Sequence, residues 1–89
     1  MVQVIAVHMV GGERHEHIAN LRWRTDGETD HHESTRTQMV TFLESNPGQA
    51  YVTDGTMTAS IGVVNATPKY VRTYADGVWT DNLLALPRY

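Results

Sequence analysis

The sequence contains no cysteine, which excludes disulfide bonds, thiolate metal sites and cysteine nucleophiles. Basic residues are also few: seven Lys and Arg residues stand against ten Asp and Glu residues, and the formal net charge is −3. Nucleic-acid-binding proteins usually gather Lys and Arg into a patch, whereas here only Arg22 and Arg24 are expected close together on one face. We therefore expect no nucleic-acid partner.

Long apolar stretches are absent as well. No segment approaches the roughly 20 apolar residues of a membrane span, and no basic segment precedes an apolar run of signal-peptide length. We expect no membrane partner and a cytoplasmic location. The composition, 40% hydrophobic and 19% charged over 89 residues, is that of a single folded domain covering residues 1–89. Because its core must be thin, a homodimer that buries one more face is a reasonable expectation.

The first part of the chain predicts two strands and a loop. Met1–Val10 is apolar and rich in β-branched residues, and the two glycines that follow favour a tight turn. His15–Thr25 alternates between two sets of side chains, as a second strand does. Asp26–Glu33 is entirely polar and begins with an Asp-Gly turn dipeptide, so it predicts an exposed loop.

A helix is predicted next. Thr35 followed by Gln38 fits a capping box, in which side chains and backbone satisfy each other's free groups. Met39, Phe42 and Leu43 form the apolar stripe expected against a sheet, with Val40 at its margin. An Asn-Pro-Gly sequence then stops the helix.

The second part of the chain predicts short strands separated by turns. Asp54-Gly55 and Asp76-Gly77 are the turn signals, and Gly62 indicates a bulge or a close neighbour. The predicted strands are Ala50–Thr53, Met57–Ala66, Tyr70–Tyr74 and Val78–Trp79.

The chain ends in a leucine-rich segment. Asp81 can cap a last helical turn, so that Leu83, Leu84 and Leu86 point inward before Pro87 ends the element. We therefore predict an α+β fold in the order β-β-α-β-β-β-β. It would have a small antiparallel sheet, one helix packed on a face, and a C-terminal leucine segment that closes the core.

The pattern R-T-x-x-D-G-x-x-x-D-N-L-x-x-L-P, over Arg72–Pro87, resembles the C-terminal signature of a family of small bacterial and phage proteins of unknown function. The run G-G-x-x-H-E-H-I, over Gly11–Ile18, is similar to one branch of that family. The resemblance implies a shared fold and a bacterial or phage source. It brings no catalytic residues to this chain.

Five histidines are many for so short a chain, and four of them form a candidate metal site. His15 and His17 would share a strand face, with His31, His32 or Glu33 arriving from the loop, and zinc is the metal that such a set would bind. The other interpretation is structural: His15 begins a strand, His17 is partly buried, and the loop histidines are solvated. We favour this interpretation and expect no cofactor.

A second candidate site is a face that combines arginines with tyrosines, which suits recognition of a protein or a small ligand. Its residues are Arg22, Arg24, Tyr51, Tyr70, Arg72 and Tyr74. The alternative is that one face of the tyrosines belongs to the core. We assign Trp23 to the core.

Catalytic motifs give little support for an enzyme. Asp76 and Asp81 bracket Trp79 and could form a carboxylate pair, but a turn and a cap explain both residues. There is no phosphate-binding glycine loop and no G-x-S-x-G sequence. We predict a small intracellular, non-enzymatic module that binds a protein partner or small ligand, and the suspected source points to phage–host interplay. The alternative is a histidine-based metal-binding or hydrolytic protein.

Overall fold

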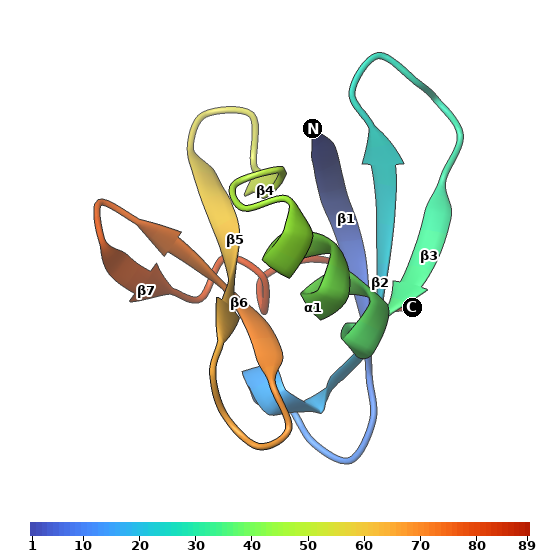
Figure 1. The fold of residues 1–89 in the computed structure, drawn as a ribbon. Helices are drawn as coiled ribbons and strands as arrows, with labels where there is room; N and C mark the ends of the chain where they lie inside the picture. The colour runs from blue at the N-terminus through green and yellow to red at the C-terminus, as the bar shows by residue number, and fades with distance from the viewer.

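The computed structural model describes all residues from Met1 to Tyr89 and contains seven strands, one α-helix and one short 3-10 helix (Figure 1). In chain order the elements are β1 (Val2–Met9), η1 (His15–His17), β2 (Ile18–Thr25), β3 (His32–Thr35), α1 (Arg36–Ser45), β4 (Ala50–Thr53), β5 (Thr58–Val64), β6 (Tyr70–Ala75) and β7 (Val78–Thr80).

All seven strands belong to one sheet, in the order β3-β2-β1-β4-β5-β6-β7. Neighbouring strands are antiparallel except β1 and β4, which are parallel and pair only Val2 with Ala50 and Gln3 with Tyr51. A parallel pair needs a crossover connection, and the chain segment through β2, β3 and α1 provides it. The sheet is therefore mixed.

The predicted α+β class is wrong, and so is the purely antiparallel sheet. The protein is a small β-rich domain, because α1 contributes only ten residues and η1 only three. The order also differs, since a third strand precedes the helix.

Two local assignments in the first part of the chain were wrong. The last two residues of the predicted loop, His32 and Glu33, belong to β3, which pairs with β2 through its backbone although its side chains are polar. Trp23 Nε1 also donates a hydrogen bond to Ser34 Oγ at 2.9 Å, which ties the two strands together. His15–His17 is a 3-10 turn rather than the start of a strand.

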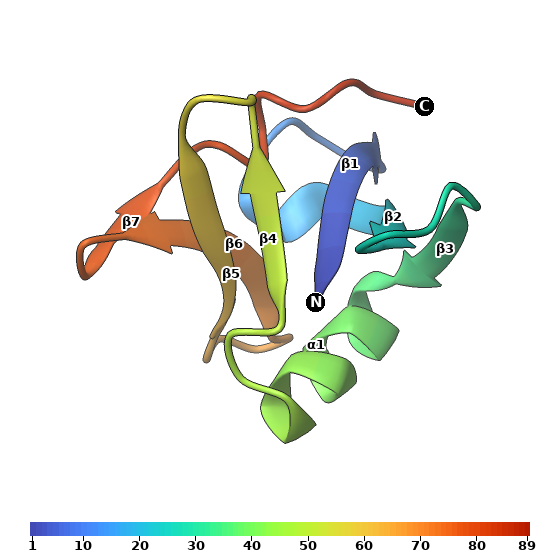
Figure 2. The ribbon, with the colours of Figure 1, turned by 90° about the horizontal axis from the view of Figure 1, so that it is seen from above.

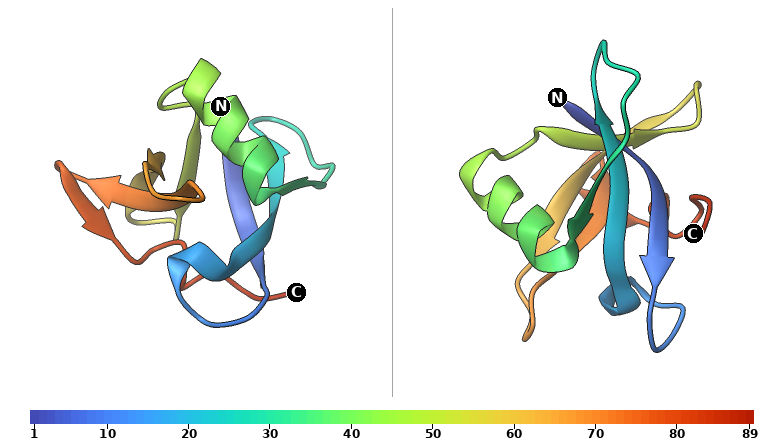
Figure 3. Two further views of the ribbon diagram at one scale, coloured as in Figure 1. Left: turned by 60° about the horizontal axis from the view of Figure 1, so that its bottom comes forward. Right: turned by 90° about the vertical axis from the view of Figure 1, so that its right-hand side faces the viewer.

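The sheet is strongly curled, as Figures 2 and 3 show. The helix α1 contacts β2 and β3 near one end of the strand order, and β5 and β6 near the other end. Only a curled sheet brings both groups of strands to one helix. Because the helix is approached from two sides, Val40 is buried, whereas Phe42 is 36% exposed, contrary to the predicted stripe. The predicted capping box of Thr35 and Gln38 is confirmed.

The core lies between the curled sheet, α1 and the C-terminal segment. Its most deeply buried members include Val4, Leu21, Ile61 and Val71, and Leu83 from the C-terminal segment is also completely buried. After Leu83 the tail passes beside β1, where its backbone exchanges hydrogen bonds with Val7. No helix of the structure has the length and apolar character needed to cross a lipid bilayer.

Candidate functional site

The hairpin of β6 and β7 carries the most prominent exposed aromatic surface. Tyr74 and Trp79 lie opposite each other in its register, with ring centroids 5.7 Å apart in an edge-to-face arrangement. Trp79 is 44% exposed, and its neighbour Val78 is 64% exposed. Tyr74 and Trp79 lie on one face of the hairpin, and Val78, the residue before Trp79 in the strand, lies on the other face. We call these three exposed residues the hairpin surface.

The turn of this hairpin follows the predicted Asp-Gly signal. Asp76 and Gly77 have φ angles of 53° and 78°. Two successive positive φ angles are typical of the tight turn whose twist matches that of paired strands. The hairpin extends away from α1 at one side of the molecule (Figure 1).

The two aromatic rings rest against β5 at Gly62. A Cβ atom at this position would lie 2.9 Å from Cε1 of Tyr74 and 3.4 Å from Cη2 of Trp79. The predicted close neighbour of Gly62 is therefore confirmed. Because Gly62 has no side chain, the two rings can pack directly against the β5 backbone. Next to Tyr74, a groove of about 190 Å³ continues to the C-terminal end of α1, with Leu43 and Val63 among its lining residues.

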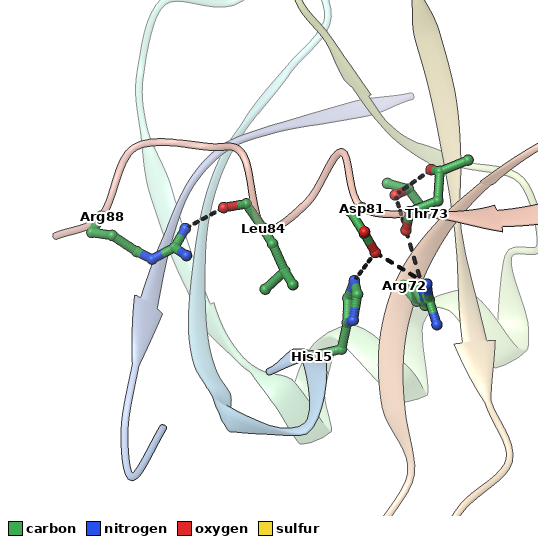
Figure 4. Close-up of polar contacts among 7 residues, drawn as sticks. His15, Arg72, Thr73, Asp81, Leu84 and Arg88 are labelled. Carbon is green, nitrogen blue, oxygen red and sulfur yellow. Dashed lines mark hydrogen bonds and ion pairs between the residues drawn. The ribbon is translucent and has the colours of Figure 1, made fainter. Parts of the chain in front are cut away.

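Polar contacts hold the base of the hairpin, and Figure 4 shows them. Arg72 Nη2 lies 3.0 Å from Asp81 Oδ1, and Arg72 Nε donates to the carbonyl oxygen of Thr80. The hydroxyl of the completely buried Thr73 donates to the same carbonyl at 3.1 Å and accepts from the Thr80 hydroxyl at 2.8 Å. We call Arg72, Thr73, Thr80 and Asp81 the hairpin clamp.

His15 lies against this clamp. The residue is 8% exposed, and its Nε2 atom lies 3.7 Å from Asp81 Oδ1 without a hydrogen-bond partner. Burial lowers the pKa of His15, and the nearby Arg72 guanidinium lowers it further, whereas Asp81 and Glu16 oppose the shift. The neutral imidazole is therefore the form that the folded state favours.

We expect the protein to lose stability as the pH falls from 8 toward 5. The unfolded chain takes up a proton at His15 below about pH 6.5, whereas the folded chain resists protonation until a lower pH. Protons consequently favour the unfolded state across this window. Thermal unfolding followed by circular dichroism at several pH values measures the effect.

The matched variants for this prediction are His15→Gln and His31→Gln, because His31 is exposed in the loop before β3. The first substitution should flatten the dependence of the melting temperature on pH, and the second should leave it as in the wild type. An unchanged slope in His15→Gln would contradict the assignment to this residue.

The structure separates the predicted arginine and tyrosine face into distinct groups. Arg22 lies 4.1 Å from the ring centroid of Tyr89 and pairs with Glu33, and Tyr70 lies across from Val64. Only two of the six predicted residues, Arg72 and Tyr74, belong to the clamp and the hairpin surface.

Arg24 of β2 and Tyr51 of β4 have polar partners elsewhere in the sheet. Arg24 donates to Gln3 Oε1 at 2.8 Å, and the Tyr51 hydroxyl donates to Asp26. This hydrogen bond raises the pKa of Tyr51. Both side chains therefore have partners within the fold.

The four predicted metal-binding histidines do not come together either. His17 Nδ1 accepts a hydrogen bond from the Arg14 backbone, and the His32 ring lies 4.7 Å from the Trp23 ring. No group of three or more His, Asp or Glu side chains has an arrangement suited to a metal ion.

The sequence did not predict that Trp79 packs with Tyr74 over Gly62, or that Val78 is exposed on the opposite face of β7. The available signal was a tryptophan in the short strand that follows the Asp76-Gly77 turn. In the sequence alone, Trp79 stands out only as a neighbour of Asp76 and Asp81.

These observations define a small, mostly β domain with an aromatic hairpin at one edge of its sheet. The chain belongs to the family described as "Protein of unknown function (DUF3892)", whose sequence profile matches residues 3–87. The predicted membership of a domain-of-unknown-function family is thereby confirmed. No curated protein and no solved structure matches the chain.

Proposed function

We propose that the protein is a small, non-enzymatic interaction module that binds a protein partner through the hairpin surface. The observation that carries the proposal is the exposure of Trp79 in the last strand of the sheet, where it packs against the exposed Tyr74 of β6. Tryptophan and tyrosine are enriched among the residues that dominate binding energy at interfaces. Exposed aromatic side chains that pack together on one face, as Tyr74 and Trp79 do, are also a usual mark of an interaction site.

The surroundings of the hairpin surface support this role because they restrain it before binding. The two rings pack against Gly62, and Arg72 and Thr73 of the clamp hold the end of β7 by hydrogen bonds to the Thr80 carbonyl. A surface that is already ordered loses less conformational freedom when a partner binds. The hairpin is therefore better suited to recognition than an unrestrained loop with the same residues.

A protein partner is favoured over a small ligand by the size of the adjoining groove. Its volume of about 190 Å³ is below the range of about 300–1,000 Å³ that is usual for ligand pockets. The groove can instead receive one side chain of a partner that covers Tyr74.

The proposal also includes the source and location predicted from the sequence. A bacterial or phage origin, a cytoplasmic location and a role in phage–host interplay agree with a compact binding domain. These three points and the homodimer remain predictions made from the sequence.

Site-specific photo-cross-linking tests the proposed surface. A photoreactive amino acid replaces Val78 in protein produced in the cells that naturally make it, and the matched control carries the same group at Glu28, exposed between β2 and β3. We expect a discrete protein adduct from position 78, no such adduct from position 28, and loss of the adduct when Trp79→Ser is added.

Trp79→Ser is compared with the parent protein by thermal unfolding, so that loss of the adduct is interpreted only for folded protein. No adduct from position 78, or an adduct that persists in folded Trp79→Ser, would overturn the proposal.

A further inference from the structure

The two edges of the sheet have different character. At the β3 edge the side chains are all polar, and Glu33 forms an ion pair with Arg22 at 3.3 Å. Charged and polar side chains are a common protection against unwanted strand pairing. At the other edge, β7 pairs only with β6 and exposes Val78 and Trp79. The three residues of β7 itself carry no charged side chain, whereas β3 contains Glu33.

Two carboxylates without an ion pair lie at the end of the sheet that contains the β6–β7 turn. Asp54 and Asp76 take part in no ion pair, and they lie at the same end of the sheet, because one follows β4, the other follows β6, and both of these strands are antiparallel to β5. Backbone N–H groups of Thr56 and Met57 donate to Asp54 and lower its pKa, so this carboxylate stays ionised at neutral pH.

Basic side chains do not offset these carboxylates. Arg72 of β6 pairs with Asp81 at 3.0 Å, and Lys69, at the opposite end of β6 from Asp76, pairs with Glu44 at 2.6 Å. The end of the sheet beside the β6–β7 turn is consequently left with net negative charge, in a protein whose formal charge is already −3.

We propose that β7 accepts an extended segment of a partner protein as an added strand, and that this segment combines β-branched residues with flanking Lys or Arg. The proposal rests on the hairpin surface being the binding site. Strand addition takes its affinity from backbone hydrogen bonds at an open sheet edge and its specificity from alternate side chains. Trp79 and Val78 supply contacts for those side chains, and Asp76 supplies charge complementarity.

A second copy of this chain is a poorer occupant of the same edge. Asp76 and Asp81 flank β7, so pairing of two β7 strands would bring the acidic flanks of two chains of net charge −3 together. Like charges placed opposite each other weaken strand pairing. A dimer formed through β7 would therefore contradict the added-strand proposal.

Two synthetic peptides serve as probes. Each is capped, carries a fluorophore, and has an alternating core of three valines and two threonines. One has two lysines at each end, and the other has two glutamates. Fluorescence anisotropy with the full chain should give a dissociation constant at least about tenfold lower for the lysine peptide, and about 0.5 M salt should weaken its binding.

Three variants locate the binding. Trp79→Ser should weaken binding of the lysine peptide by about tenfold or more. Asp76→Asn keeps a residue that tolerates positive φ and should weaken it about threefold. Asp30→Asn, in the exposed segment before β3, should leave binding unchanged.

Equal affinity for both peptides, binding of neither, or full binding by Trp79→Ser would overturn the added-strand proposal. A dimer in sedimentation experiments that Trp79→Ser dissolves would assign the edge to a second copy and would also overturn it. If cross-linking from Val78 succeeds while the peptides fail, the interaction module stands without the added strand; if cross-linking fails as well, both proposals fall.

Discussion

Leu83→Ala is expected to destabilise the protein by about 2–5 kcal/mol, the usual cost of removing a fully buried leucine side chain and leaving a cavity. Leu83 has no exposed surface and joins the C-terminal segment to the core formed by strands and helix. A domain of this size has a total stability of about 5–15 kcal/mol, so this single change removes a large fraction of it. Urea unfolding followed by circular dichroism measures the loss.

The neighbouring Leu84 provides the matched control. It packs against the core but is only partly buried, so Leu84→Ala should cost clearly less than Leu83→Ala. The same residue type is shortened in both variants, and the two side chains differ in burial. Equal losses, or a loss below about 1 kcal/mol for Leu83→Ala, would contradict the structural role given to Leu83.

Gly62→Ala is expected to destabilise the protein by about 1–3 kcal/mol, the usual cost of forcing an extra group into a filled space. The added Cβ atom would lie 2.9 Å from a ring carbon of Tyr74, so the ring must move. Gly62 does not have a positive φ angle, and alanine would otherwise favour the folded state by reducing the freedom of the unfolded chain. The sign of the change therefore reports the steric contact with the ring.

A double-mutant cycle with Tyr74→Ala controls for other effects at this position. In the Tyr74→Ala background the methyl group at position 62 meets no tyrosine ring, so its cost should shrink. Thermal unfolding of the wild type, the two single variants and the double variant gives the coupling free energy between positions 62 and 74. A stabilised Gly62→Ala protein, or equal costs in both backgrounds, would show that the rings do not rest on this glycine.

The parts of the fold that follow from local chemistry could be predicted from the sequence. The capping box of Thr35 and Gln38 depends on residues three positions apart, and the structure contains both of its hydrogen bonds. The Asp76-Gly77 turn depends on two residues that accept positive φ angles. Such features need no knowledge of distant strands.

The sheet could not be predicted in the same way, because it depends on pairing between distant segments. The strand β3 has no apolar face and is held by β2, through the backbone and the bond from Trp23 to Ser34. The parallel contact of β1 and β4 joins segments almost 50 residues apart through only two residue pairs. Neither leaves a periodic signal in the sequence.

The candidate site was only partly predictable for the same reason. Alternation correctly placed Arg72 and Tyr74 opposite the buried Val71 and Thr73. It could not show that Arg24 and Tyr51 have partners elsewhere in the sheet. The importance of Trp79 depends on its position in the last strand, which is a property of the strand order.

Backbone amide chemical shifts during titration of ¹⁵N-labelled protein with the lysine peptide test the central claim most directly. We predict that the largest changes fall on Val78–Thr80 and on the side-chain N–H of Trp79, with smaller changes at Tyr74, because these residues form the open edge and its aromatic surface. The Trp23 indole N–H, which donates to Ser34, is an internal reference that should stay in place. Largest changes in β3 or α1, or no changes at β7, would contradict the assignment of the binding surface to the hairpin.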